Sequence, residues 1–261
     1  MTAARALSAP PPDPAGPAGL ALPDAVLRPV SGNAFEVTIE QLATAIRLGV
    51  FTRGEALPPE RELAERLGVS RNTLREAIAA LREAGFVATR RGRGGGTWVT
   101  YAGTEPGAAG TEVADGIDVE DALNFREVVE PGAAELAARR TLTADERAWL
   151  AASCRAVREA PDNAAHRVAD SRLHLAIAAL AGSPMLVDSV TRAQATLHEL
   201  LSAIPVLRTN IEHSNDQHDA IVDAILGGQA EAARIAMGEH CEATAALLRG
   251  LIGPRREKGS R

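Results

Sequence analysis

The chain of 261 residues is long enough for one large domain or two small ones with a hydrophobic core. Its composition, 46% hydrophobic and 24% charged, is near the average of soluble globular proteins and excludes a fibrous or wholly disordered chain. No apolar run approaches the roughly 18 residues of a membrane helix, no secretory signal is evident, and two cysteines are too few for a disulfide framework. We therefore expect a cytoplasmic protein without a membrane partner.

The net charge of −6 conceals an uneven distribution along the chain. Residues 31–103 hold ten arginines against eight glutamates, whereas residues 104–252 carry 23 acidic and 12 basic side chains. A locally basic segment beside an acidic body predicts a module that binds a polyanion, joined to a second domain.

Composition also predicts the domain boundaries. Residues 1–30 hold seven prolines and show no apolar period, so we predict a disordered arm that is dispensable for folding. The stretch 102–116 is rich in Gly, Ala and Thr and reads as a linker, and residues 253–261 form a basic tail. The expected domains are therefore 31–101 and 117–252.

Three helices and a β-hairpin are predicted in the first domain. Thr38 and Gln41 have the spacing of a capping box, which would begin the first helix. The predicted elements are a helix from Thr38 to Gly49, a helix over Pro59–Leu67 closed by Gly68, a helix from the N-cap Ser70 to Gly85, and strands at 86–89 and 97–101.

The turn at residues 67–70 has the length and glycine content of a helix-turn-helix. In that motif the start of the second helix enters the major groove of DNA. Arginine pairs with guanine, asparagine pairs with adenine, and hydroxyl groups bind phosphate. The side chains of this kind, which lie away from the apolar face of the third predicted helix, are Arg71, Asn72, Thr73 and Arg75.

The segments 57–64 and 68–77 closely resemble the winged helix-turn-helix of GntR-family transcriptional regulators, and the match runs from Thr38 to Val99. The resemblance implies double-stranded DNA as the partner. Because one helix reads too few bases for specificity, we expect a homodimer on a palindromic operator. The DNA contacts implied by the resemblance are Arg61, Ser70, Arg71, Asn72, Thr73 and Arg75, with Arg91 and Gly92 at the tip of the wing.

The second domain is predicted to be entirely helical, because no strand pattern occurs in it. The fold class is therefore an α+β winged helix-turn-helix head followed by an all-α helical bundle. The predicted helices run from Asp118 to Arg140 with a kink at Pro131, from a capping box at Thr143, and over Ala164–Ala181, Met185–Ile204, Ser214–Leu226 and Gln229–Leu251.

Asp170 and His174 are four residues apart, so both project from one helix face, and His218 and His240 lie in two later helices. Three imidazoles and a carboxylate converging in a bundle suit one divalent metal per chain, zinc first, with nickel or manganese as alternatives. The same spacing also occurs in solvated surface pairs. We interpret His166, His198 and His213 as bundle or surface histidines, and Cys241 as a buried thiol.

The helical half resembles the FadR-type ligand-binding (FCD) domain that follows a GntR head, on the motifs at residues 125–131, 170–174, 217–221 and 239–240. In metal-binding members, the resemblance implies, Asp170, His174, His218 and His240 are the ligands. It also implies that Arg126 pairs with a carboxylate of a small organic acid, the effector. Ser183 departs from the pattern, which usually has Asn there, so the effector stays open.

The main hypothesis is a transcriptional regulator, acting as a repressor, whose DNA affinity is controlled by the acid. One alternative is a regulator that senses the metal itself, and another binds an acyl-CoA, against which the intact Asp/His set argues. A metal-dependent hydrolase is a further alternative. It lacks the Glu of an H-E-x-x-H motif and a nucleophile elbow, so we expect no enzyme.

Overall fold

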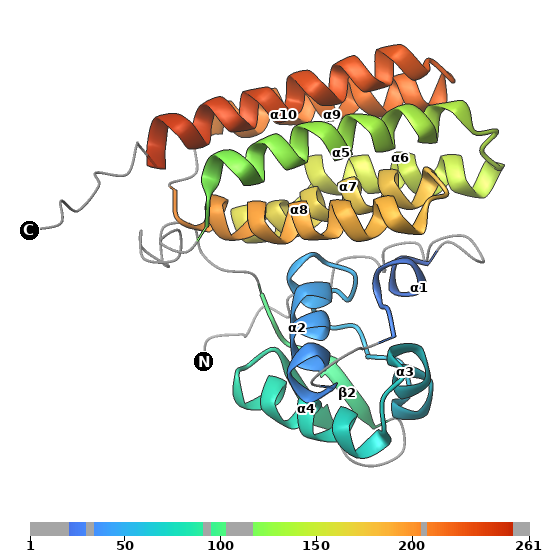
Figure 1. Ribbon diagram of the computed structural model, residues 1–261, viewed down its shortest axis with the longest axis vertical. Helices are drawn as coiled ribbons and strands as arrows, with labels where there is room; N and C mark the ends of the chain where they lie inside the picture. The colour runs from blue at the N-terminus through green and yellow to red at the C-terminus, as the bar shows by residue number, and fades with distance from the viewer. Residues whose placement is uncertain (1–20, 30–33, 91–94, 103–116, 205–207, 253–261) are drawn as a thin grey trace, which may run out of the picture.

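The computed structural model of the chain describes residues 21–29, 34–90, 95–102, 117–204 and 208–252. Within these ranges the chain forms a small N-terminal head and a larger helical body. In Figure 1 the head lies below the body. None of the helices in these ranges is both long and apolar enough to cross a lipid bilayer.

The head contains the three helices and the hairpin of a winged helix-turn-helix, as predicted. They are α2 (Ala34–Arg47), α3 (Glu60–Leu67), α4 (Arg71–Glu83), β1 (Val87–Arg90) and β2 (Gly96–Val99). Gly68 ends α3 in the left-handed conformation, with φ of 63°, which glycine adopts without strain. Ser70 caps α4, since its Oγ accepts a 3.0 Å hydrogen bond from the backbone N–H of Thr73.

The wing is an antiparallel pair of strands whose register places Val87 opposite Val99. An isolated bridge joins residue 56, just before α3, to β2 and ties the wing to the rest of the head. Both paired valines are buried, so the hairpin contributes to the head core. The predicted wing-tip residues Arg91 and Gly92 lie outside the described residues.

Two predicted helix starts are wrong: the body helix predicted from Ser214 begins at Arg208, and the first helix of the head does not begin at Thr38. α2 begins at Ala34, and Thr38 is buried in its second turn, where Oγ1 donates a 2.5 Å hydrogen bond to the carbonyl of Ala34. This bond to the preceding turn is an alternative to capping that threonine has inside a helix. The other half of the predicted capping box is also engaged elsewhere, because Oε1 of Gln41 accepts a hydrogen bond from the backbone N–H of Arg28.

The body is a bundle of six helices within the described residues, as predicted. Figure 1 shows α9 and α10 in the layer farthest from the head, α7 and α8 nearest to it, and α5 between them. Asp118 caps α5, and Thr143 with Glu146 forms a reciprocal capping box at the start of α6. The helices are α5 (Val119–Arg139), α6 (Ala144–Arg158), α7 (Asn163–Leu180), α8 (Pro184–Ser202), α9 (Arg208–Leu226) and α10 (Ala230–Ile252).

The structure corrects part of the predicted arm. Residues 1–20 lie outside the described residues, but residues 21–29 contain a short helix, α1 (Leu22–Val26). Leu22 and Leu27 are buried there, and α1 packs against α7 and α8 of the body. The arm was predicted from its prolines, yet a proline is compatible with the first turn of a helix, where Pro23 lies.

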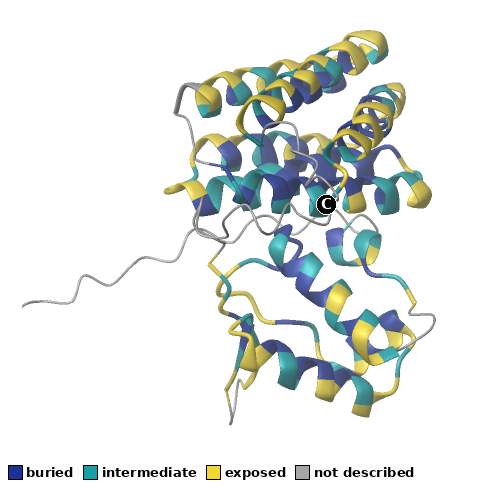
Figure 2. Ribbon diagram, turned by 60° about the vertical axis from the view of Figure 1, so that its left-hand side comes forward, coloured by how far each residue is buried: buried dark blue, intermediate teal, exposed yellow. Residues whose placement is uncertain are grey.

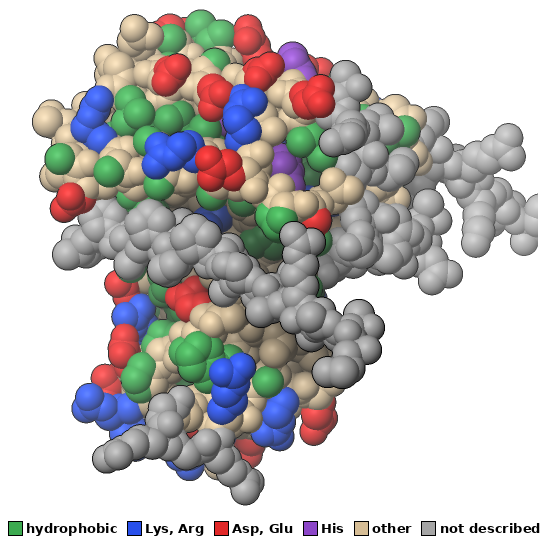
Figure 3. Space-filling view, turned by 180° about the vertical axis from the view of Figure 1, so that it is seen from behind, with side chains coloured by type: hydrophobic (Ala, Val, Ile, Leu, Met, Phe, Trp, Pro, Cys, Tyr) green, Lys and Arg blue, Asp and Glu red, His purple; other side chains and the backbone are tan. Residues whose placement is uncertain are grey.

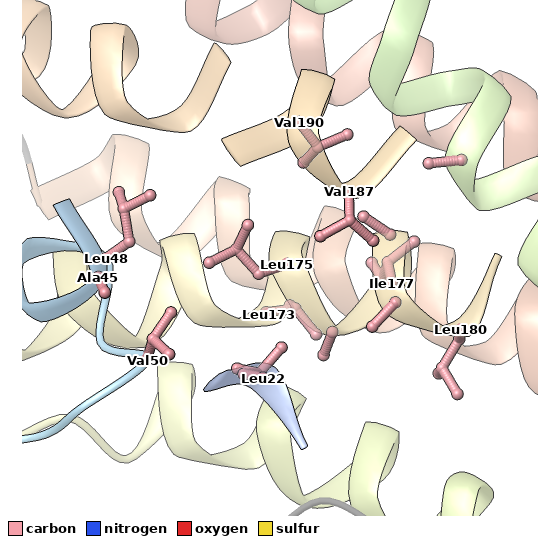
Figure 4. Packing of buried hydrophobic residues seen from close by; sticks show 14 of the residues in the cluster. Leu22, Ala45, Leu48, Val50, Leu173, Leu175, Ile177, Leu180, Val187 and Val190 are labelled. Atoms are coloured by element: carbon pink, nitrogen blue, oxygen red, sulfur yellow. The ribbon is translucent and has the colours of Figure 1, made fainter. Parts of the chain in front are cut away.

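Head and body share one hydrophobic core. Leu48 and Val50, just after the end of α2, belong to the same cluster of buried residues as Leu173 and Leu175 of α7. Figure 4 shows these side chains close together, with Leu22 of α1 beside them. Figure 2 shows that buried residues occupy the inner faces of the helices and exposed residues the outer faces. The head is therefore packed against the body through apolar contacts.

Candidate DNA-binding face and buried histidine cluster

The predicted DNA-contacting side chains lie together at the start of α4. Arg71, Asn72 and Arg75 are exposed, whereas Leu74 and Ile78 on the opposite side of the helix are buried in the head. This separation follows from the 3.6-residue period of the helix. Ser70 and Arg61 are also exposed, and Thr73 is half-buried. In Figure 3, arginine side chains gather toward the lower end of the head, away from the body.

Two of these groups are held by carboxylates. Nε of Arg75 lies 2.7 Å from Oε2 of Glu60, and Nδ2 of Asn72 donates a 2.8 Å hydrogen bond to Oε1 of Glu76. Exposed pairs of this kind contribute only about 0–1 kcal/mol, so phosphates and base edges can displace them at small cost. The face is compatible with docking into a major groove.

Three histidines from three helices meet inside the body. His174 comes from α7, His218 from α9 and His240 from α10, and each is at most 3% exposed. The ring centroids are 5.5 Å apart for His174 and His218, 5.1 Å for His174 and His240, and 4.6 Å for His218 and His240. One ring nitrogen from each histidine lies within 4.8 Å of the other two.

The cluster fits a divalent metal. Two nitrogens that each bind zinc at about 2.0–2.1 Å are at most about 4.2 Å apart, so only a small inward movement is needed. Burial lowers the pKa of His218 to about 4 and the pKa of His240 well below its usual value. Both rings are therefore neutral near pH 7, the form that binds metals. Neither ring nitrogen of His218 makes a hydrogen bond to a described residue.

Asp170 lies at the edge of this cluster. Its Oδ1 is 3.4 Å from Nε2 of His218, but it is not part of the group in which all ligand atoms lie within 4.8 Å. Burial raises the pKa of Asp170, and the neighbouring rings of His218 and His174 outweigh burial, so the pKa is lowered. The structure thus places an anion next to the three rings.

Glu130 of α5 is a functional candidate that sequence reasoning missed. Its Oε2 is 2.9 Å from Nδ1 of His174 and 3.1 Å from Nε of Arg126, and its Oε1 accepts a 2.6 Å hydrogen bond from Gln194. Burial raises the pKa of Glu130, but the charges of Arg126 and His174 lower it to about 2. A carboxylate behind a ligand imidazole fixes the orientation of the ring. The spacing of four residues between Arg126 and Glu130, which places both side chains on one helix face, is the sequence signal that could have identified Glu130.

A cavity of about 120 Å³ opens beside the cluster. One water needs roughly 10–15 Å³ on this measure, so the cavity accommodates a small organic molecule. Nη1 of Arg126 is buried without a hydrogen-bond partner among the described residues. The polar side chains that line the cavity include Arg126, Asp170, Gln194, Gln217 and His240.

Three further histidines line the same cavity. They are His166, His198 and His213, which the sequence pattern predicts to be bundle or surface residues. His213 is exposed, His166 accepts or donates a 3.3 Å hydrogen bond with Asn215, and His198 is buried. The interpretation holds for their exposure but misses their common place around one cavity. Cys241 is a buried thiol, as expected.

Comparison with known proteins places these two parts in described families. The family of bacterial regulatory proteins named gntR matches residues 36–96, and the FCD domain matches residues 121–243. The chain is 34% identical to the HTH-type regulator RmpR of Mycobacterium gastri, over 78% of this chain and 76% of that protein. The chain belongs to the GntR family.

A further relative and a solved structure agree with this assignment. The chain is 31% identical to the Uxu operon transcriptional regulator of Escherichia coli, over 74% of this chain and 77% of that protein. The structure of E. coli McbR/YncC superposes with a TM-score of 0.51 at 17% identity, covering 84% of this chain and 99% of that one, and supports the fold alone. The protein is a DNA-binding transcriptional regulator with an FCD domain, not an enzyme, which removes the hydrolase alternative.

Proposed function

We propose that this GntR-family regulator holds a divalent metal in its body and that a small organic acid, bound beside the metal, changes its affinity for operator DNA. One observation carries the proposal: a buried cluster of three histidines adjoins a cavity that Arg126 also lines. The metal ligands are His174, His218, His240 and Asp170, and zinc, nickel and manganese all suit this set. The size and polar lining of the cavity favour a small acid over an acyl-CoA.

Two cationic elements would hold the acid. When bound, the metal supplies a fixed positive charge in a poorly solvated site, where attraction for a carboxylate is little screened. Arg126 contributes the second charge. Its Nε is engaged by Glu130, whereas Nη1 is buried without a partner among the described residues and is available to a carboxylate.

Helix α7 connects this site to the head. It carries Asp170 and His174, and Val168 and Arg172 of the same helix contact the loop after α2. Nη1 of Arg172 donates a 3.0 Å hydrogen bond to the carbonyl of Gly49, and a Cβ at Gly49 would lie only 2.6 Å from Val168. A small shift of α7 on ligand binding would therefore move the head. Such coupling requires different acid affinities in the two arrangements, typically about 1–3 kcal/mol.

On DNA we infer a homodimer bound to a palindromic operator in the cytoplasm. Each copy would insert the start of α4 into one half-site, because a symmetric protein reads a symmetric site. We propose that the bound dimer represses transcription and that the acid releases it.

Metal content tests the first half of the proposal. Protein purified without a histidine tag or chelator should contain about one divalent metal per chain by elemental analysis, and His240→Ala should lose most of it. His213→Ala, which changes an exposed histidine of the same cavity, is the matched control and should keep its metal. Metal-free wild-type protein would contradict the site.

Operator binding tests the second half. Fluorescence anisotropy with genomic operator fragments would measure affinity with metal alone and with added acids. Arg126→Lys preserves the positive charge beside Glu130 but removes the planar guanidinium. We expect this variant to retain metal and to lose the acid response. A response to metal alone, with no acid effect, would favour the metal-sensing alternative, and an unchanged acid response in Arg126→Lys would remove Arg126 from the site.

A further inference from the structure

A second set of buried polar groups lines the cavity, apart from those assigned above. His198 on α8 is 7% exposed, and neither of its ring nitrogens has a hydrogen-bond partner among the described residues. Nη1 of Arg167 on α7 is also buried without a partner in the described part of the chain. Buried polar groups without partners cost free energy, so a site that keeps them is suited to a ligand.

The two side chains face the same space from neighbouring helices. Both line the cavity, and α7 packs against α8. Burial, followed by the positive charge of Arg167, lowers the pKa of His198 to about 4. His198 is therefore neutral near pH 7 and offers one N–H donor and one acceptor.

Arg167 differs from Arg126 in how its charge is balanced. Arg126 forms a buried ion pair with Glu130 at 3.1 Å, whereas Arg167 forms no ion pair with a residue that the structure describes. Asp170, one turn along α7, attracts Arg167, but its Oδ1 lies 3.4 Å from His218. Arg167 itself is partly exposed, but its buried Nη1 has no carboxylate partner among the described residues, which favours binding of an anion.

Gln194 adds an acceptor to the cavity. Its Nε2 donates a 2.6 Å hydrogen bond to Glu130, which fixes the orientation of the amide. Its Oε1 is buried, and it has no partner among the described residues. A carboxylate cannot donate to this oxygen, whereas a hydroxyl group can.

We propose that Arg167 and His198 bind a second carboxylate of the effector, and that the effector is a hydroxylated dicarboxylic acid. The inference rests on the proposed function, because the first carboxylate is the one assigned there to Arg126. The hydroxyl group of the acid donates to Oε1 of Gln194. The cavity thus distinguishes a dicarboxylate from a monocarboxylate by a cation that only the former neutralises.

Titration calorimetry on the metal-loaded, full-length protein tests this. The probes are malonate, succinate, glutarate and adipate, each beside the monocarboxylate of equal carbon number, with malate beside succinate for the hydroxyl group. The best dicarboxylate should bind about tenfold to a hundredfold more tightly than its monocarboxylate, the range expected for hydrogen bonds to a charged group. Malate should bind more tightly than succinate.

Arg167→Gln should abolish the preference for dicarboxylates without changing monocarboxylate binding or metal content. Arg155→Gln removes an exposed arginine from α6 of the same body and should change neither. Equal affinities for the two classes in wild-type protein, or an equal loss of both in Arg167→Gln, would overturn the inference. If no member of the series binds while another acid still shifts operator affinity through Arg126, the dicarboxylate class is wrong and the proposed function stands.

Thermal unfolding without metal or acid gives an independent readout. Arg167→Leu and His198→Leu remove buried nitrogens that have no hydrogen-bond partners among the described residues, so both should melt at or above the temperature of the wild type. A marked loss of stability in both variants would show that these side chains serve the fold, and would overturn their assignment to the ligand.

Discussion

The functional groups of the head and of the body differ in how their polar atoms are satisfied. In the head, Arg75 and Asn72 lie on the surface, and each is paired with a carboxylate of the head itself. In the body, His198 and His218 are buried, and their ring nitrogens have no hydrogen-bond partners among the described residues. A DNA-binding face can exchange weak exposed pairs for phosphates, whereas the buried site gains stability when a ligand satisfies it.

The difference also concerns how each site is assembled. Most of the residues predicted to contact DNA, from Ser70 to Arg75, follow one another on α4 and its cap, so a single helix positions them, and Arg61 lies on α3. The body site takes side chains from five helices, α5, α7, α8, α9 and α10, which must pack correctly before any two of them meet. We therefore expect substitutions in the head face to alter DNA affinity alone, and substitutions in the body site to alter stability as well.

The largest effect is expected at Glu130. Glu130→Gln would leave Arg126 charged and buried without its counter-charge, which we expect to cost about 3–5 kcal/mol in the free energy of unfolding. Urea denaturation monitored by circular dichroism would measure it. Glu127→Gln, which changes an exposed residue of the same helix, is the control. Equal stability of Glu130→Gln and wild type would show that the pair is not needed for the fold.

Truncation of Leu22 tests whether the segment before the head is part of the core. Leu22 is 3% exposed and packs with body residues, so Leu22→Ala should cost about 2–5 kcal/mol. Met185→Ala on α8, where the methionine is 81% exposed, should have little effect on the same denaturation curve. An unchanged free energy of unfolding in Leu22→Ala would support the prediction that residues 21–29 belong to a dispensable arm.

The head and the segment before it show which features a sequence pattern can predict in this protein. Signals confined to a few neighbouring residues, such as Ser70 as an N-cap and Gly68 as a helix end, predicted the head correctly. The prediction of Thr38 as an N-cap was wrong because a threonine hydroxyl group can either cap a helix or donate to the carbonyl of the preceding turn. The sequence pattern does not show which of the two bonds forms. The helix at Leu22 packs against α7 and α8, which are distant in the sequence, so the residues around Leu22 do not by themselves predict it.

The body site shows the same limit at longer range. His174, His218 and His240 were predicted from their placement on three helices and then from the family resemblance, and the structure brings them together. Spacing places Glu130 on the same helix face as Arg126, but it does not contain the contact of Glu130 with His174 on α7 or the position of His198 beside the cavity. Both of these depend on which helices lie side by side.

Acid should destabilise the body through His198. Its pKa is lowered to about 4 in the folded protein from the ordinary 6.5, so the unfolded chain binds a proton over this interval and the folded chain does not. Stability is therefore full above about pH 6.5 and falls as the pH drops toward 4, by about 3 kcal/mol for this group. His198→Leu should lose less stability than wild type between pH 7 and pH 4, measured in chelator to exclude metal. Parallel pH profiles would contradict the prediction.

Substitutions at the exposed start of α4 should change DNA affinity and leave the stability of the protein unchanged. Arg71→Ala and Arg75→Ala should each cost about 1–3 kcal/mol of operator binding if they contact bases, with much smaller losses on unrelated DNA. Arg82→Ala, exposed at the far end of α4, is the control. Anisotropy titrations at fixed salt would measure these differences. Wild-type affinity in both variants would mean that another surface reads the operator.

The smallest effect is expected at two ion pairs of α8, one with Arg28 in the segment before the head and one with Arg47 of α2, and it bears most directly on how head and body communicate. Nε of Arg28 lies 3.0 Å from Oδ1 of Asp188 on α8, with both side chains partly exposed. A double-mutant cycle with Arg28→Ala and Asp188→Ala should give a coupling energy of about 0.2–1 kcal/mol.

The informative quantity is the change in that coupling when metal and acid are added. The backbone N–H of Arg28 donates a hydrogen bond to Gln41 of α2, which ties Arg28 to the head. If ligand binding moves the head, and Arg28 with it, the coupling energy across Arg28 and Asp188 must change, because the distance between the charges sets it. The pair Arg47 and Glu199, 3.9 Å apart, joins α2 to α8 and provides a second, weaker cycle. Coupling energies that stay constant in both cycles, in protein whose operator affinity still responds to acid, would show that head and body remain fixed to each other. The signal would then have to pass through a change in how two copies of the chain are arranged.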